Sequence, residues 1–573
     1  MLPLLYLDFW TDKQLSAIPR FEMPEQIRQI NRPRRQWPAF DPWSVGAVAI
    51  AFVVLLPILA VLWFALNPTE PIWVHLWSTT LPRYLSNTIV LMCAVGAMAA
   101  CVGTGAAWLV TMYEFAGRRW LQWALLMPLA VPAYVGAYAL VDFFEYAGPV
   151  QTGLRGIFGW QTSQHYWFPA IRTRGAAVVV LSAALYPYVY ILARAAFREM
   201  SGAGFEVARA LGAGPFARFW RVGLPLARPA IAAGVAVVMM ETVNDFGTVD
   251  YFAVQTLTTG IFSVWLQGGN LGGAAQLAVC VLTIVVVLVT LEKLSRRKSR
   301  VFSGARSARP VTRTQLTGVQ AMMATAICLI PVLIGFVLPV TVLGSHAIDA
   351  GEWAAPDLHL AIIRTVVVAG LAAILTVLGG VFMVYGVRLS GRRLPTLAMP
   401  VTAIGYAAPG AVLALGILVP LASFDNWFAD GILALTGYDP GLLLTGTAAA
   451  LVLAYVVRFF AIAQGTADAA LGRVSPSLPM AARSLGRTAG GTLKAVHLPL
   501  VRASVGSALL LVFVDAVKEL PATLLLRPFN FDTLATRVHA KASLENIAEA
   551  APAALMITLI GLAAVAFLAR ANR

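Results

Sequence analysis

The chain has 573 residues, of which 59% are hydrophobic and only 12% charged, with a formal net charge of +15. Soluble domains average about 25% charged residues, so this composition excludes an ordinary soluble domain and indicates a membrane protein with several spans. The four cysteines (Cys93, Cys101, Cys280, Cys328) lie in apolar stretches without metal-ligand spacing. We therefore expect them to be small core residues rather than zinc ligands or disulfides.

The chain begins with a basic segment, residues 1–42, which lacks an apolar core followed by a small-residue cleavage site. We expect a cytoplasmic tail there rather than a cleaved signal peptide. Apolar stretches of about 20 residues, enough to cross a bilayer, then recur along the chain. They predict twelve spans, near 43–66, 86–113, 122–143, 176–197, 228–250 and 274–292, and near 318–344, 361–387, 396–421, 442–462, 501–525 and 551–569.

The expected fold class is therefore an all-α polytopic membrane protein. We predict a first half at 43–293, a basic cytoplasmic linker at 294–317 and a second half at 318–573. Six spans in each half make the halves parallel repeats, related by an axis along the membrane normal. Pro132 and Pro409 are expected to interrupt spans three and nine at matching places.

The basic residues support one orientation. Of the 42 lysines and arginines, 32 fall on the proposed cytoplasmic side, eight on the other side and two (Arg458 and Lys518) within spans. This bias follows the positive-inside rule and places both termini in the cytoplasm. The net charge thus reflects membrane topology, and we expect no nucleic-acid partner.

A repeated segment follows the fourth span of each set. Glu206–Pro225 (EVARALGAGPFARFWRVGLP) returns in the second half as Met480–Pro499 (MAARSLGRTAGGTLKAVHLP), with a constant offset in residue number. Each copy predicts helix, turn, helix: its glycine can adopt the positive φ that ends a helix, and its Leu-Pro pair is expected to end the second helix. One copy alone could be an amphipathic helix on a lipid surface, but two copies with matched spacing argue against that reading. The shared positions are Ala208, Gly212, Leu224 and Pro225 in the first copy and Ala482, Gly486, Leu498 and Pro499 in the second.

These residues resemble the cytoplasmic EAA loop of permease subunits in ATP-binding-cassette importers, where the loop docks as a coupling helix into a cleft of the ATPase subunit. The first copy also has the acid of the pattern, Glu206, whereas the second has Met480 in its place. The resemblance implies a type I importer permease fold in the bacterial inner membrane. It also implies two ATPase subunits, one per loop, and a periplasmic substrate-binding protein.

No phosphate-binding G-x-x-x-x-G-K-[ST] motif occurs in the chain. We therefore expect a transport subunit that is not an enzyme and holds no cofactor of its own. ATP and Mg²⁺ would be bound by the partner ATPases.

Acids inside spans are costly and suggest function. Glu241 and Asp245 in span five are matched, at the same offset as the repeated segments, by Asp515 and Glu519 in span eleven, which also holds Lys518. The i, i+4 spacing predicts that the two acids of a pair share one face of a helix, toward a translocation pathway. They could act as a gate or in packing, with Lys518 neutralising Asp515, or they could contact the cargo as a transient metal site.

The segments ETVNDFGTVDYF and DAVKELPATLLLRPFNFDTLATR also resemble fused, double-length permeases of the ferric-iron import class, a likeness that covers residues 86–569. It implies Fe³⁺ as cargo, delivered by a periplasmic protein. Permeases for thiamine, polyamines, sulfate or phosphonates share much of the pattern and stay open as alternatives. An ion-coupled secondary transporter would leave the paired loops unexplained, and for a membrane-embedded enzyme the sequence offers no nucleophile–base or metal constellation.

Overall fold

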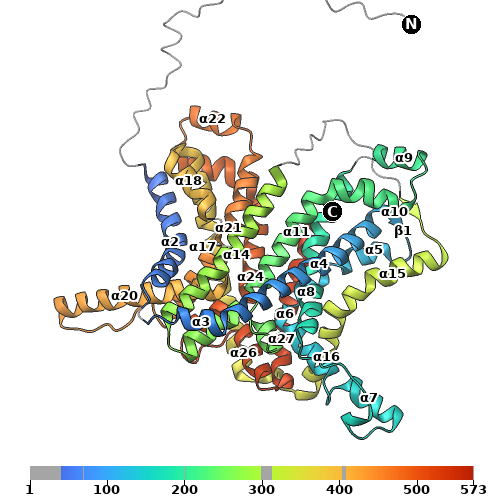
Figure 1. Ribbon diagram of the computed structural model, residues 1–573. Helices are drawn as coiled ribbons and strands as arrows, with labels where there is room; N and C mark the ends of the chain where they lie inside the picture. Colours follow the sequence, from blue (N-terminus) through green and yellow to red (C-terminus); the bar gives the residue numbers. More distant parts are fainter. Residues whose placement is uncertain are drawn as a thin grey trace, which may run out of the picture.

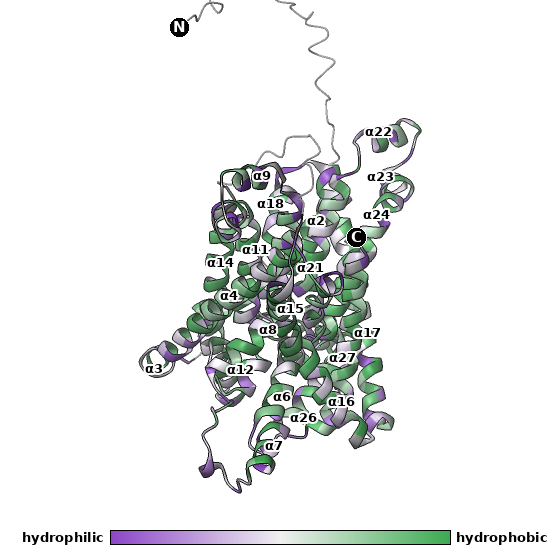
Figure 2. Ribbon diagram, turned by 90° about the vertical axis from the view of Figure 1, so that its right-hand side faces the viewer, coloured by the Kyte–Doolittle hydropathy of each residue, from purple (hydrophilic) through white to green (hydrophobic). Residues whose placement is uncertain are grey.

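The fold is seen in a computed structural model, which describes residues 41–571 except 69, 201, 298–312, 403–404 and 406–407. Most of the predicted tail (1–42) and of the predicted linker (294–317) lies outside the described residues. The remainder is a bundle of long helices (Figure 1), which confirms the predicted all-α class. Hydrophobic residues run along the middle of the helices and hydrophilic ones gather toward the ends of the bundle (Figure 2).

Eleven of the described helices are long and apolar enough to cross a membrane, and a bent pair broken by 95° raises the number to twelve. This agrees with the predicted number of spans. In the first half the membrane helices are α2 (Pro42–Leu66), α4 (Leu81–Met112), α5 (Arg118–Ala124) with α6 (Ala133–Phe144), α8 (Arg174–Glu199), α11 (Leu224–Asn244) and α14 (Leu271–Arg297). In the second half they are α15 (Gly318–Val332) with α16 (Leu338–Ala350), α17 (Pro356–Ser390), α18 (Arg393–Thr402) with α20 (Gly410–Thr436), α21 (Ala448–Gly472), α24 (Leu498–Val517) and α27 (Ile547–Ala571).

Shorter helices connect these spans. They are α3 (Trp73–Thr79), α7 (Pro149–Phe158), α9 (Gly202–Ala210), α10 (Pro215–Arg218), α12 (Gly247–Tyr251), α13 (Leu257–Phe262), α22 (Ser477–Ser484), α23 (Ala489–Thr492), α25 (Pro521–Leu526) and α26 (Leu534–Ser543). Helices α9 and α22 lie at one end of the bundle, whereas α7 and α26 lie toward the other (Figure 1). The two repeated segments therefore share one end of the molecule.

The two predicted proline breaks are present at equivalent places. Pro132 is the residue before α6 and Pro409 the residue before α20. Proline has a φ suited to the start of a helix but supplies no N–H to a preceding turn. Each apolar stretch is consequently divided close to its proline, as predicted.

The first membrane helix of each half packs against helices of both halves. Helix α2 packs against α17 and α20 of the second half, while α15 packs against α4 and α5 of the first. A short parallel ladder supports α15, because β1 (Tyr113–Glu114) pairs with β2 (Thr314–Gln315) and the amide of Leu316 donates to the carbonyl of Glu114 at 2.9 Å. Each half therefore completes its packing with a helix from the other.

Candidate translocation pathway and coupling loops

The two repeated segments have the same backbone. Gly212 and Gly486 have φ values of +79° and +81°, in the region that favours glycine. Around Gly212, the amide of Ala213 donates to the carbonyl of Ala208 at 2.9 Å, and the equivalent bond from Arg487 to Ala482 is 3.1 Å. Both first helices thus end in the same left-handed glycine turn.

The Leu-Pro pairs do not end the second helix of each segment, contrary to the prediction. They lie in the first turn of the membrane helices α11 and α24, directly after π-helical turns at Phe219–Gly223 and Leu493–His497. In the first copy the amide of Leu224 donates to the carbonyl of Phe219. This wider turn lets the helix continue past a proline that lacks an N–H, so 215–244 and 489–517 each form one continuous helix.

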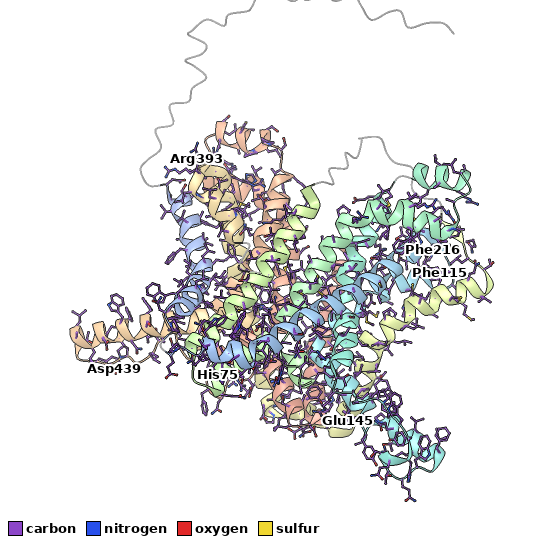
Figure 3. The ribbon with its side chains drawn as sticks, viewed as in Figure 1. His75, Phe115, Glu145, Phe216, Arg393 and Asp439 are labelled. Atoms are coloured by element: carbon purple, nitrogen blue, oxygen red, sulfur yellow. The ribbon has the colours of Figure 1, made fainter. Side chains whose placement is uncertain are left out.

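The outer surfaces of the two segments differ. Leu211 and its equivalent Leu485 are 82% and 84% exposed, so each turn presents an apolar tip. Phe216, which Figure 3 labels near the end of the bundle, is also exposed, but its equivalent in the second segment is Gly490. Exposed apolar patches of this kind mark interaction surfaces, and the first segment offers the larger one.

A central cavity of about 140 Å³ lies between the halves. All five span residues singled out in the sequence line it, namely Glu241, Asp245, Asp515, Lys518 and Glu519. They come from the ends of α11 and α24, the helices that continue directly from the repeated segments. The structure therefore brings together side chains from both halves that the sequence could only pair by spacing.

The acids of each pair do not share one helix, contrary to the prediction. Helix α11 ends at Asn244 and α24 at Val517, so Asp245 and Glu519 lie in the breaks that follow. Two backbone amides and a threonine hydroxyl hold each carboxylate. Asp245 accepts from the amides of Thr248 (3.0 Å) and Val249 (3.1 Å) and the hydroxyl of Thr248 (3.0 Å).

Glu519 repeats this arrangement in the second half. It accepts from the amides of Ala522 (3.2 Å) and Thr523 (3.1 Å) and from the hydroxyl of Thr523 (2.9 Å). The first turn of a helix has amides without helical partners, and a carboxylate satisfies them well. Asp245 and Glu519 therefore stabilise the start of α12 and α25 at the edge of the cavity.

Two cations balance part of the negative charge. Lys518 pairs with Asp515 at 2.8 Å, as the packing interpretation anticipated. Arg458, from α21, lies 3.8 Å from Glu519 with both side chains largely buried. Its equivalent in the first half is Ala184, so only the second half has this arginine.

Sequence reasoning counted Arg458 as a residue inside a span but assigned it no role. Its position in an apolar helix was the available signal, because buried charges are expensive without a purpose. Three residues that line the cavity each have one buried polar atom without a hydrogen-bond partner among the described residues, namely Nη1 of Arg458, Oδ1 of Asn244 and the hydroxyl of Tyr134. The charged side chains of the lining, rather than these buried atoms, make the cavity suitable for a polar or charged occupant.

Side-chain contacts join the two halves at one end of the bundle. Tyr138, one turn along α6 from the cavity residue Tyr134, bonds through its hydroxyl to Nδ1 of His539 at 2.9 Å. One turn further, Asp142 meets Nε2 of His346 at 2.8 Å. These contacts lie toward the end of the bundle opposite the repeated segments.

An arginine bridges the halves beyond these contacts. Arg172 binds Glu145 at 3.1 Å and Glu545 of the second half at 2.7 Å, and Figure 3 labels Glu145 close to α7. Burial opposes the charged form, but the hydrogen bonds and negative charge of Glu145, together with Glu545, raise the pKa of Arg172 above its ordinary value. The arginine thus stays charged and joins the two halves at this end.

The sequence leaves metal ligation by the pathway acids open. Across the described residues no group of three or more His, Cys, Asp or Glu side chains is arranged to hold a metal ion. The capping bonds of Asp245 and Glu519 already use much of their acceptor capacity. The described part of the chain therefore gives no evidence for a permanently bound metal ion.

A helical bundle with a charged central cavity and paired loops at one end is the arrangement expected of a membrane permease. Residues 95–301 match the family described as "Binding-protein-dependent transport system inner membrane component". The chain is 26% identical over 491 residues to the Fe(3+)-transport system permease protein FbpB 2 of Haemophilus influenzae, covering 84% of this chain and 89% of that protein. The predicted resemblance to double-length importer permeases is confirmed, and the many apolar helices agree with a multi-pass inner-membrane transport component.

Shorter relatives match part of the chain. The molybdenum transport system permease protein ModB of Escherichia coli is 29% identical over 196 residues, which cover 32% of this chain and 79% of that protein. The sulfate transport system permease protein CysT of Salmonella typhimurium is 26% identical over 279 residues, covering 47% and 96% respectively. These relatives are transport subunits rather than enzymes.

The Asp515–Lys518 pair allows a test of packing against pathway function. Asp515→Asn alone should reduce the yield of folded permease, because it leaves the lysine ammonium without its partner. Combining it with Lys518→Met should restore assembly and much of the transport, measured by size-exclusion yield and by uptake into cells. A double variant that assembles but does not transport would instead assign Asp515, Lys518 or both to the pathway itself.

Proposed function

We propose that this chain forms the membrane pathway of an importer that carries Fe³⁺ delivered by a periplasmic binding protein. One ATPase subunit would dock on each repeated segment, binding the ATP and Mg²⁺ that the permease itself does not hold. The two halves, 43–293 and 318–573, would then act as the two permease units of the complex. Both termini would lie in the cytoplasm with the repeated segments.

The observation that carries this proposal is that acids from both halves line one cavity at the ends of the helices that continue from the repeated segments. A movement of either segment would displace a continuous helix, and with it Glu241 or Asp515 and the break beyond. A movement that brings the two repeated segments together at one end of the bundle would thereby separate the contacts made by Tyr138, Asp142 and Arg172 at the other end. That is the coupling an alternating-access importer requires.

The cavity chemistry is compatible with a hard cation in transit. Four carboxylate residues and two cations, Arg458 and Lys518, line the cavity. Oxygen ligands suit hard cations. Because the described residues hold no preformed metal cluster, Fe³⁺ would pass through weak contacts without being trapped.

An oxyanion is the second candidate cargo, and one observation favours it. Arg458 lines the cavity, its Nη1 has no hydrogen-bond partner among the described residues, and a guanidinium suits oxyanions. The relatives named for sulfate and molybdenum transport are consistent with such a cargo. Organic cargoes such as thiamine, a polyamine or a phosphonate would use the same machinery.

The cargo can be tested by uptake in a strain that lacks its own transporter for each candidate. Cells with and without this chain, its ATPase and its binding protein would receive labelled Fe³⁺, sulfate or molybdate. The proposal expects chain-dependent accumulation of iron that unlabelled Fe³⁺ suppresses and the oxyanions do not. Accumulation of sulfate or molybdate without iron would show that the cargo is an oxyanion rather than Fe³⁺. It would leave the assignment of the chain as a permease unchanged.

The two docking sites should be unequal. Glu206→Ala is expected to weaken ATPase binding severalfold, because it removes the exposed acid of the first segment, whereas Met480→Ala should change binding little. Binding of the isolated ATPase to purified permease, measured by surface plasmon resonance in two salt concentrations, would show the difference. Equal effects of the two substitutions would rule out a specific role for the acid.

A further inference from the structure

A second polar hollow lies apart from the central cavity. It has a volume of about 190 Å³ and is lined by residues from the ends of α4, α5 and α8 and by the residue before β2. Four arginines line it: Arg118, Arg194, Arg198 and Arg313. Among the described residues one acid pairs with them, Glu114, which lies 3.2 Å from Arg118 and 3.8 Å from Arg313.

Side chains in the hollow are held in place. Arg118 is only 6% exposed, and its Nε donates to the carbonyl of Val110 at 2.7 Å. Arg194 donates to Oε1 of Gln122 at 3.0 Å and lies over the ring of Trp123 at 5.1 Å. Four positive charges facing one acid leave a strong local excess, which an anion would relieve.

The hollow continues into an apolar trough. An adjoining pocket of about 210 Å³ shares Trp123, Arg194 and Arg198 with it. The rest of its lining is apolar and consists of Leu126, Leu129, Ile191, Ala195 and Val565. A charged end joined to an apolar trough fits an amphiphile better than a free ion.

We propose that the hollow and the trough together bind one anionic phospholipid. The phosphate would lie among the arginines, and part of one acyl chain would occupy the trough. The site is at the end of the bundle that carries the repeated segments, where head groups meet the protein. Basic pockets between membrane helices at such a level are known to suit anionic head groups.

The positive-inside bias alone does not account for this cluster, because the second half lacks it. The equivalents of Arg194 and Arg198 are Asp468 and Gly472. Asp468 pairs with Arg388 at 2.6 Å, so the corresponding place is neutralised within the chain. The arginine pair of α8 therefore has no counterpart at the equivalent place of the second half.

The test uses the purified full-length permease, stripped of lipid in detergent and titrated with phosphatidylglycerol or phosphatidylcholine under native mass spectrometry. Wild-type protein should retain one phosphatidylglycerol in preference to phosphatidylcholine. Arg194→Gln with Arg198→Gln should weaken that binding by roughly 30-fold, about 2 kcal/mol for two cations near a phosphate. Ile191→Asn should also weaken it, by obstructing the trough with a polar side chain.

The matched control is Arg393→Gln with Arg502→Gln, which removes two exposed arginines elsewhere and should leave binding unchanged. If the double variant does not fold, the single variant Arg198→Gln can replace it, because this arginine is exposed. The single variant should weaken phosphatidylglycerol binding severalfold. Equal affinity for the two lipids, or equal losses in the control, would overturn the proposal. Displacement by glycerol 3-phosphate, inorganic phosphate or sulfate at the same concentration as phosphatidylglycerol would replace it with a site for a soluble anion.

Discussion

Glu519→Ala is expected to be the most destabilising single change at the central cavity, by about 3–5 kcal/mol, because it leaves a buried arginine without its acid. Arg458 would lose its partner at 3.8 Å, and two amides and a threonine hydroxyl at the start of α25 would lose their acceptor. Folded yield and thermal unfolding of the purified permease would both measure the loss.

The first half supplies a matched control. Asp245→Ala removes the same type of cap from α12, but the position equivalent to Arg458 is Ala184. Its loss should be nearer the value of about 0.5–2 kcal/mol that is typical of a helix cap. Adding Arg458→Met to Glu519→Ala should recover much of the difference. Equal effects of the two alanine variants would refute the role given to Arg458.

Amide substitutions separate capping from transport. Asp245→Asn and Glu519→Gln keep an oxygen that can accept from the following helix, so folding should be affected less than in the alanine variants. If the carboxylates take part in the pathway, uptake should fall by tenfold or more while the ATPases still bind. Full uptake in both variants would leave these acids as packing residues and remove the main internal argument for a cation.

The second large effect is expected at the turns of the repeated segments. Gly212→Val and Gly486→Val should each reduce transport-coupled ATP hydrolysis by more than tenfold. An added Cβ would meet nothing within 4 Å at either position, so the effect comes from the backbone. A β-branched residue at positive φ is strained, and relief of that strain would reorient the apolar tips at Leu211 and Leu485.

Neighbouring glycines serve as controls in the same segments. Gly214 has a φ of −64° and Gly490 lies in helix α23, and an added Cβ at either would also meet nothing within 4 Å. Gly214→Val and Gly490→Val should therefore be tolerated better than the changes at positive φ. ATPase activity in proteoliposomes with and without binding protein measures the coupling. A coupled activity as high in the Gly212 and Gly486 variants as in these controls would contradict the assigned role of the turns.

The sequence by itself determined the class of protein. The length of an apolar stretch and the spacing of its residues can be read directly from the chain. They predicted the spans, the breaks at Pro132 and Pro409, the internal repeat and the glycine turns at Gly212 and Gly486. The same spacing also selected the residues that meet at the central cavity, because equivalent positions in two parallel halves face a common axis. The likeness to importer permeases rested on these local patterns.

Only the tertiary structure decided how those residues are used. An apolar run does not reveal where a membrane helix ends, so the breaks at Asp245 and Glu519 and their capping bonds were missed. A π-helical turn before each Leu-Pro pair lets the helix continue past Pro225 and Pro499, which were expected to end it. Arg458 reaches Glu519 from a different membrane helix, and α2 and α15 each pack on the opposite half. Such contacts depend on how helices from distant parts of the chain pack, which no local pattern specifies.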